Sequence, residues 1–100
     1  MTQLDHIAVC VTDVQASVDW YIDTYDASEI YSDASWGMVV IGSVKIALIL
    51  KGTHPPHIAL TQRCPVPIDA KQHRDGSRYI YDTDPDGNII ERIWWPLDVQ

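Results

Sequence analysis

The chain has 100 residues, 46% of them hydrophobic, and a net charge of −7 at pH 7. This size and composition fit one compact domain, residues 1–100, with enough apolar side chains to fill a core. The negative charge argues against nucleic acid and anionic membranes as partners, because both attract basic patches.

The N-terminus and the cysteines predict the cellular compartment of the protein. The first residues form no basic, apolar leader, and no apolar run approaches the roughly 18 residues of a membrane-spanning helix. We therefore expect neither a signal peptide nor a transmembrane segment. Cys10 and Cys64 form no CxxC pair, which favours free thiols in a reducing cytoplasm.

The first half of the chain predicts a strand, a helix and three further strands. Alternating apolar residues indicate a strand over Leu4–Val11, with His6 and Cys10 on one face. A helix should begin at Thr12 or Asp13 and end near Asp26, because apolar residues then recur every three or four positions. The three strands are expected at residues 28–32, 36–41 and 44–50, the last two joined by a tight Gly-Ser hairpin.

The second half of the chain predicts strands without a helix. The segment Lys51–Pro56 contains a glycine and two prolines and is the clearest internal break. Residues 64–76 contain two more prolines and read as a loop with at most one irregular strand. The predicted strands are residues 57–61, 77–82 and 89–95.

An internal repeat connects the two halves. Asp5–Val9 (DHIAV) matches Pro56–Leu60 (PHIAL) at an offset of 51, and Lys45–Ile49 matches Ile89–Ile93 at an offset of 44. The second copy is therefore about seven residues shorter, and the loss falls where the first copy has its helix. We expect two modules, residues 1–52 and 56–100, the second with its helix missing.

Three residues of the repeat could form a metal site. His6 and His57 begin the two copies, and Glu91 lies among apolar neighbours on the last strand. Two imidazoles and one carboxylate form the set that binds Fe(II), Mn(II) or Zn(II) with positions left open for substrate. The alternative is structural: the histidines would be hydrogen-bonded core residues, and Glu91 would pair with Arg78 or Arg92.

Three stretches of the sequence carry a family resemblance: Leu4–Val9 (LDHIAV), the helix with Trp20-Tyr21, and the ending Tyr81–Glu91 (YDTDPDGNIIE). They resemble the vicinal oxygen chelate superfamily, which includes glyoxalase I, extradiol dioxygenases, fosfomycin-resistance transferases and bleomycin-binding proteins. The resemblance implies an α+β fold of paired βαβββ modules forming a curved mixed sheet around a metal cup.

The resemblance also implies roles for individual residues. His6, His57 and Glu91 match the metal positions of the superfamily, whereas the fourth ligand position of glyoxalase I is occupied by Ala47. Tyr81 matches a tyrosine that lies beside the substrate in the dioxygenase and fosfomycin branches. The fosfomycin branch has a threonine where this chain has Ala8, which weakens that assignment.

Other candidates are less specific. His73 could supply the acid–base histidine of extradiol dioxygenases, although a solvated loop histidine is the more ordinary interpretation. Trp36, Met38 and Tyr79 could line a substrate pocket or fill the core. The DxDxDG run from Asp82 resembles the start of a calcium loop, but its twelfth position is Ile93 and a turn explains the run better.

These observations lead to one preferred function and one alternative. The preferred function is a small metal-dependent enzyme, dioxygenase-like or lyase-like, acting on an oxygen-rich small molecule that chelates the ion. The alternative is a metal-free protein that sequesters small molecules, as the bleomycin binders do. The missing helix should expose apolar residues Ile58, Leu60, Ile80 and Ile90, so we expect a homodimer that covers them. In several families of the superfamily the metal ligands come from two chains.

Overall fold

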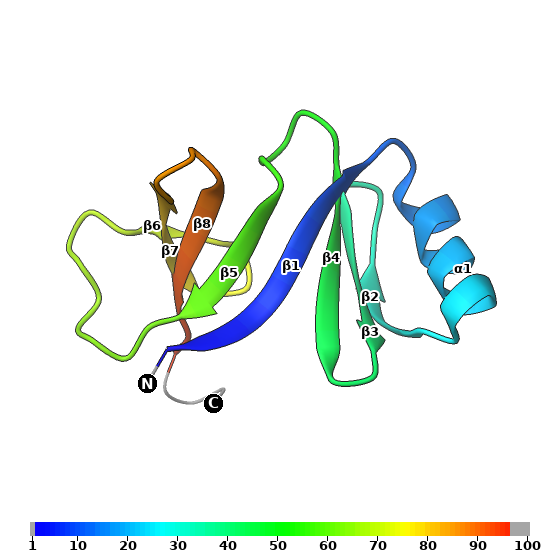
Figure 1. The fold of residues 1–100 in the computed structure, drawn as a ribbon, viewed down its shortest axis with the longest axis horizontal. Helices are drawn as coiled ribbons and strands as arrows, with labels where there is room; N and C mark the ends of the chain where they lie inside the picture. The colour runs from blue at the N-terminus through cyan, green and yellow to red at the C-terminus, as the bar shows by residue number, and fades with distance from the viewer. Residues whose placement is uncertain (1, 97–100) are drawn as a thin grey trace. The chain divides into compact units, whose positions relative to one another are not determined.

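The computed structural model describes residues 2–96 of the chain. Their secondary structure, seen in Figure 1, is one helix and eight strands. The elements are β1 (Gln3–Val11), α1 (Val14–Tyr25), β2 (Ser28–Ser32), β3 (Trp36–Ile41), β4 (Val44–Leu50), β5 (His57–Thr61), β6 (Lys71–Gln72), β7 (Arg78–Thr83) and β8 (Ile89–Trp94). The α+β class predicted above is confirmed, and residues 56–96 contain no helix, as predicted. Among the described residues there is no helix with the length and apolar character needed to span a membrane.

Local side-chain chemistry sets both ends of α1. Asp13 adopts an extended conformation before the helix, and its Oδ1 accepts a hydrogen bond from the Ala16 amide at 3.0 Å. This satisfies one of the helix's unpaired N–H groups. Asp26 ends the helix in the left-handed region, with φ 58°; its N–H donates to the Ile22 carbonyl at 3.0 Å, and the Ala27 N–H donates to the Tyr21 carbonyl at 3.3 Å. The predicted start and end of the helix are therefore correct.

The chain forms two compact units. The first unit is residues 6–57, and its strands lie in the order β2-β3-β4-β1, with β1 parallel to β4 and the other pairs antiparallel. The helix covers one face of this sheet (Figure 1). Its buried residues Val14 and Val18 pack with Val39 and Leu48 in an apolar core.

The second unit is residues 2–5 together with 58–96. Its strands lie in the order β5-β8-β7-β6, with β5 parallel to β8 and the remaining pairs antiparallel. No helix is found among the described residues of this unit. The irregular segment before β6 is tied to the sheet by side chains: Trp94 Nε1 donates to the Cys64 carbonyl at 2.9 Å, and Arg78 Nη2 donates to the Ala70 carbonyl at 2.5 Å.

The sequence repeat is a repeat of strand register. In the first unit Ala8 on β1 lies opposite Ala47 on β4, and in the second unit Ala59 on β5 lies opposite Glu91 on β8. The two pairs are related by the same offsets of 51 and 44 residues found in the sequence. Each unit therefore contains the same parallel strand pair, and Glu91 is the structural counterpart of Ala47.

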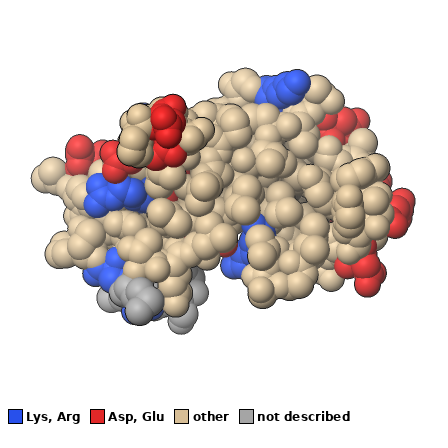
Figure 2. All heavy atoms as spheres, in the orientation of Figure 1, with Lys and Arg blue, Asp and Glu red and all other residues tan. Residues whose placement is uncertain are grey.

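The turn between β7 and β8 is built by one aspartate. Asp84 Oδ1 accepts hydrogen bonds from the amides of Asp86 and Asn88, and its Oδ2 accepts from Asn88 Nδ2. Together these bonds, led by that from the Asn88 side chain, hold the pKa of Asp84 below its usual value. The acidic run is thus part of a hairpin turn, as predicted, and Figure 2 shows acidic side chains over this turn and over α1.

Close packing between α1 and β3 can be tested at Gly37. An added Cβ there would lie 3.1 Å from Val14 Cγ1 and 3.1 Å from Val18 Cγ2. We expect Gly37→Ala to lower the free energy of unfolding by about 1–3 kcal/mol, because the helix must move away from the strand. Urea unfolding followed by circular dichroism measures this change.

The matched control is Ser43→Ala in the exposed β3–β4 turn, which should change the free energy of unfolding by less than about 0.5 kcal/mol. Equal stability of Gly37→Ala and the wild type would show that the helix does not approach the sheet this closely.

Candidate functional site

Two buried histidines lie against each other in the first unit. His6, near the start of β1, is 8% exposed, and His57, at the start of β5, is 7% exposed. Their ring centroids are 5.6 Å apart, with an interplanar angle of 70°. The two histidines that begin the sequence repeat are therefore neighbours in space, as the repeat predicts.

The tautomer of His57 is set by a backbone carbonyl. His57 Nδ1 lies 2.7 Å from the carbonyl oxygen of Pro55. Because a carbonyl can only accept, Nδ1 carries the hydrogen, and in the neutral ring Nε2 carries the lone pair. Metal-ligating histidines commonly have this arrangement, in which the second ring nitrogen donates to a carbonyl or carboxylate.

Small side chains lie beyond the histidines on the face of the sheet that α1 does not cover. Ala8 and Ala47 are buried with Ile49, and Met38 packs against them. Trp36 lies opposite Ile49 in the β3–β4 register, so it belongs to the same face. Met38 and Trp36 therefore share this face, on which Ala47 offers no ligand atom.

Cys10 lies on the same strand face as His6. Its thiol donates a hydrogen bond to the His54 carbonyl, with a Sγ to oxygen distance of 3.4 Å. Cys10 is partly buried and Cys64 is exposed, and both are free thiols. The Cys10 contact ties the break before β5 to β1, which is a structural role.

Glu91 is a buried carboxylate in the second unit. It is 1% exposed and lies opposite Tyr81 in the β7–β8 register. Its Oε2 is 2.8 Å from His73 Nε2. The ordinary interpretation of His73, as a solvated loop histidine, is therefore wrong: its side chain is 25% exposed and contacts the buried Glu91 carboxylate. Arg78 donates to Ala70 and Arg92 contacts Asp82 and Gln62, so the sequence's candidate arginine partners are otherwise engaged.

Three ring side chains, His73, Tyr79 and Tyr81, pack in a row beside this carboxylate. The His73 ring stacks on Tyr79 with centroids 3.8 Å apart and planes 10° apart, and Tyr79 lies 5.3 Å from Tyr81. Burial, the negative charge of Glu91 and the neighbouring Tyr79 raise the pKa of Tyr81 well above its ordinary value. The Tyr81 hydroxyl therefore keeps its proton through the physiological range and is a hydrogen-bond donor.

The described residues thus contain three buried side chains that can each offer one ligand atom to a metal ion: His6, His57 and Glu91. Sequence reasoning identified all three. It did not identify the bond between His73 and Glu91, because the loop before β7 has no periodicity from which a side-chain direction can be read.

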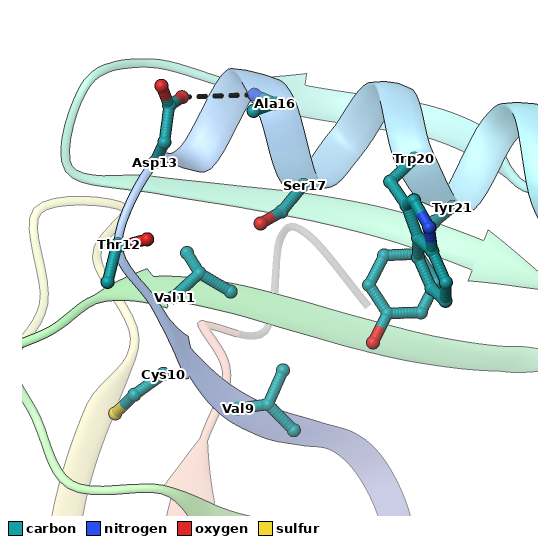
Figure 3. Close-up of a pocket in the computed structure, with 9 residues that line it drawn as sticks. All are labelled: Val9, Cys10, Val11, Thr12, Asp13, Ala16, Ser17, Trp20 and Tyr21. Carbon is teal, nitrogen blue, oxygen red and sulfur yellow. Dashed lines mark hydrogen bonds between the residues drawn. The ribbon is translucent and has the colours of Figure 1, made fainter.

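A separate hollow lies beside the first turns of α1, on the helix-covered face (Figure 3). Val9 and Val11 form its floor, and the hydroxyl groups of Thr12, Ser17 and Tyr21 point toward it in Figure 3. The residues that line it are Val9, Cys10, Val11, Thr12, Asp13, Ala16, Ser17, Trp20 and Tyr21. None of the predicted ligands belongs to it.

Known proteins resemble this chain in structure, but their sequences are not detectably similar to it. No family model and no curated protein matches the sequence. Among solved structures, a hypothetical protein from Bacillus halodurans is 14% identical with a TM-score of 0.77, covering 95% of each chain. A glyoxalase/bleomycin resistance protein/dioxygenase superfamily member from Vibrio splendidus is 9% identical with a TM-score of 0.70, covering 95% of this chain and 100% of that one.

A third similar structure is methylmalonyl-CoA epimerase from Streptomyces coelicolor, a variant in complex with 2-nitronate-propionyl-CoA. It is 18% identical with a TM-score of 0.68, covering 94% of this chain and 97% of that one. Identities this low are informative about the fold alone. Together with the repeated parallel strand pair, they establish that this chain has the vicinal oxygen chelate fold.

Proposed function

We propose that His6, His57 and Glu91 bind one divalent metal ion, Fe, Mn or Zn, and that the protein is a small metal-dependent enzyme. The observation that carries this proposal is the pair of buried imidazoles, 5.6 Å apart, in which the Pro55 carbonyl directs the His57 Nε2 lone pair away from the backbone. Two neutral imidazoles and a carboxylate are suitable ligands for these ions.

Strand register supports the inclusion of Glu91. His57 and Ala59 are two residues apart on β5 and so share a face of the strand. Ala59 is the register partner of Glu91. The Glu91 side chain therefore lies on the same face of the β5–β8 pair as His57. It is level with Ala59, two residues after His57.

The burial of Glu91 supports a bound cation. Removing a carboxylate from water costs several kcal/mol unless positive charge or hydrogen bonds compensate for the lost hydration. Glu91 is 1% exposed, and His73 accounts for one of its oxygens. A divalent ion at this carboxylate would supply further compensating positive charge.

The reaction class follows from the ligand set and from the residues around it. A divalent ion held there would polarise adjacent oxygens of a chelating substrate or, as iron, activate dioxygen, which is dioxygenase-like or lyase-like chemistry. Tyr81, which keeps its proton, would donate a hydrogen bond to a substrate oxygen. The substrate pocket would be lined by Trp36, Met38 and Tyr79. His73, which contacts Glu91, would be the acid–base residue. The two free thiols fit a cytoplasmic enzyme.

The alternative function is a metal-free protein that sequesters small molecules, of the bleomycin-resistance type. It would use the same apolar and aromatic face without an ion. The two functions differ in one measurable property, the metal content of the purified protein.

Metal content tests the proposal directly. Protein purified without chelators should contain about one divalent ion per three-ligand site, measured by elemental analysis. His57→Ala and Glu91→Gln should each lose the ion, because two ligands hold a labile metal weakly. The control is His54→Ala, which removes an imidazole three residues before His57 and should keep the ion. Wild-type protein that takes up no Fe, Mn or Zn would leave the metal-free binder as the function.

The protonated state of Tyr81 has a measurable consequence for stability. The unfolded chain releases this proton near the ordinary tyrosine pKa of about 10, whereas the folded chain retains it to higher pH. The contribution of Tyr81 to stability is therefore present below about pH 10 and decreases as pH rises above it. Urea unfolding on both sides of that pH should find a smaller decrease in Tyr81→Phe than in the wild type. Parallel decreases would contradict a raised pKa for Tyr81.

We also propose a homodimer that covers the second unit. One face of its sheet has no helix over it: Ile58 there is 41% exposed, and Leu60, Ile80 and Ile90 on the same face are partly buried. An apolar surface of this kind usually marks an interface.

Light scattering at micromolar concentration should therefore find a dimer for the wild type. Leu60→Lys should shift the protein toward the monomer, because it introduces a charge into the apolar face. Ser43→Lys, in the exposed β3–β4 turn, is the matched control and should remain dimeric. A monomeric wild type would exclude the dimer.

A further inference from the structure

The contact between His73 and Glu91 is the starting point. The two side chains are joined at 2.8 Å through His73 Nε2 and Glu91 Oε2, and the carboxylate is almost fully buried. A carboxylate oxygen is an acceptor, so the imidazole N–H donates. A hydrogen bond to a charged, buried group is among the stronger ones in proteins, and it engages one of the two carboxylate oxygens.

The orientation of the His73 ring is fixed by Tyr79. The two rings are nearly parallel, with centroids 3.8 Å apart and planes 10° apart. Tyr79 projects from β7, which is paired along its length with β8, the strand that carries Glu91. The stack therefore fixes the plane of the His73 ring against a strand, and the hydrogen bond to Glu91 selects the orientation in which Nε2 faces the carboxylate.

The backbone of His73 is fixed as well. The His73 amide donates to the Ser77 carbonyl at 2.8 Å, and the Gly76 amide donates back to the His73 carbonyl at 3.0 Å. Ser77 is fully buried, and its amide and hydroxyl both donate to Asp75 Oδ1, at 2.9 and 2.6 Å. Gly76 has φ 94°, a conformation that suits glycine. The hairpin between β6 and β7 thus holds His73 in one place.

We propose that His73 is a positioning residue for Glu91. Its hydrogen bond to Oε2 restricts rotation of the carboxylate and so sets the direction in which Glu91 faces the ion. This inference rests on the metal site proposed above and adds to it: the orientation of the carboxylate ligand depends on a loop histidine. Partners of this kind typically contribute 10- to 100-fold to metal affinity.

Two substitutions of His73 separate the hydrogen bond from the stacking. His73→Phe keeps a ring against Tyr79 but has no N–H to donate, and His73→Gln keeps a donor but has no ring. Calorimetric titration of the chelator-treated full-length protein with Zn²⁺ measures the affinity. We expect His73→Phe to weaken Zn²⁺ binding by about 10- to 100-fold and His73→Gln to recover most of that loss.

The matched control is Gln72→Ala, an exposed neutral residue of the same hairpin, which should bind Zn²⁺ as the wild type does. Urea unfolding of each metal-free variant identifies effects on folding, and His73→Leu, which also lacks a donor, replaces His73→Phe if that variant does not fold. A purely structural role predicts wild-type Zn²⁺ affinity for every folded variant, and that result would overturn the proposal while the metal site stands. A wild type that binds no Zn²⁺, Fe²⁺ or Mn²⁺ would overturn both.

Discussion

A carboxylate that is buried in the middle of a strand must be compensated, and the second unit is organised around that requirement. Glu91 on β8 is almost fully removed from water. Its neighbours are a hydrogen-bonded histidine from the β6–β7 hairpin and a tyrosine from β7 that stays protonated beside it. The antiparallel register of β7 and β8 places Tyr81 opposite Glu91, and the segment before β7 supplies His73.

The two units share one strand arrangement but carry different residues on it. In the first unit the parallel pair carries Ala8 and Ala47, and the opposite face is covered by α1. In the second unit the equivalent pair carries Ala59 and Glu91, without a helix. The position that carries an alanine in the first unit therefore carries a carboxylate in the second.

Much of the fold could be predicted because the relevant signals are local. Alternation of apolar residues located the strands, Asp13 and Asp26 marked the ends of α1, and Asp84 marked the last turn. The repeat of DHIAV by PHIAL added long-range information, since equivalent segments occupy equivalent positions in paired modules. His6, His57 and Glu91 could be identified for that reason, and not from their spacing, which is too irregular to indicate a site.

The sequence by itself determined the order of the helix and strands along residues 2–96, and it identified His6, His57 and Glu91 as candidate ligands with Ala47 at the position that matches Glu91. The tertiary structure alone decided how those residues are held. The His57 tautomer depends on the Pro55 carbonyl, and the partner of Glu91 Oε2 is His73, which is 18 residues away in sequence. Such partners come from irregular segments whose side-chain directions follow no period, so only the folded backbone fixes them.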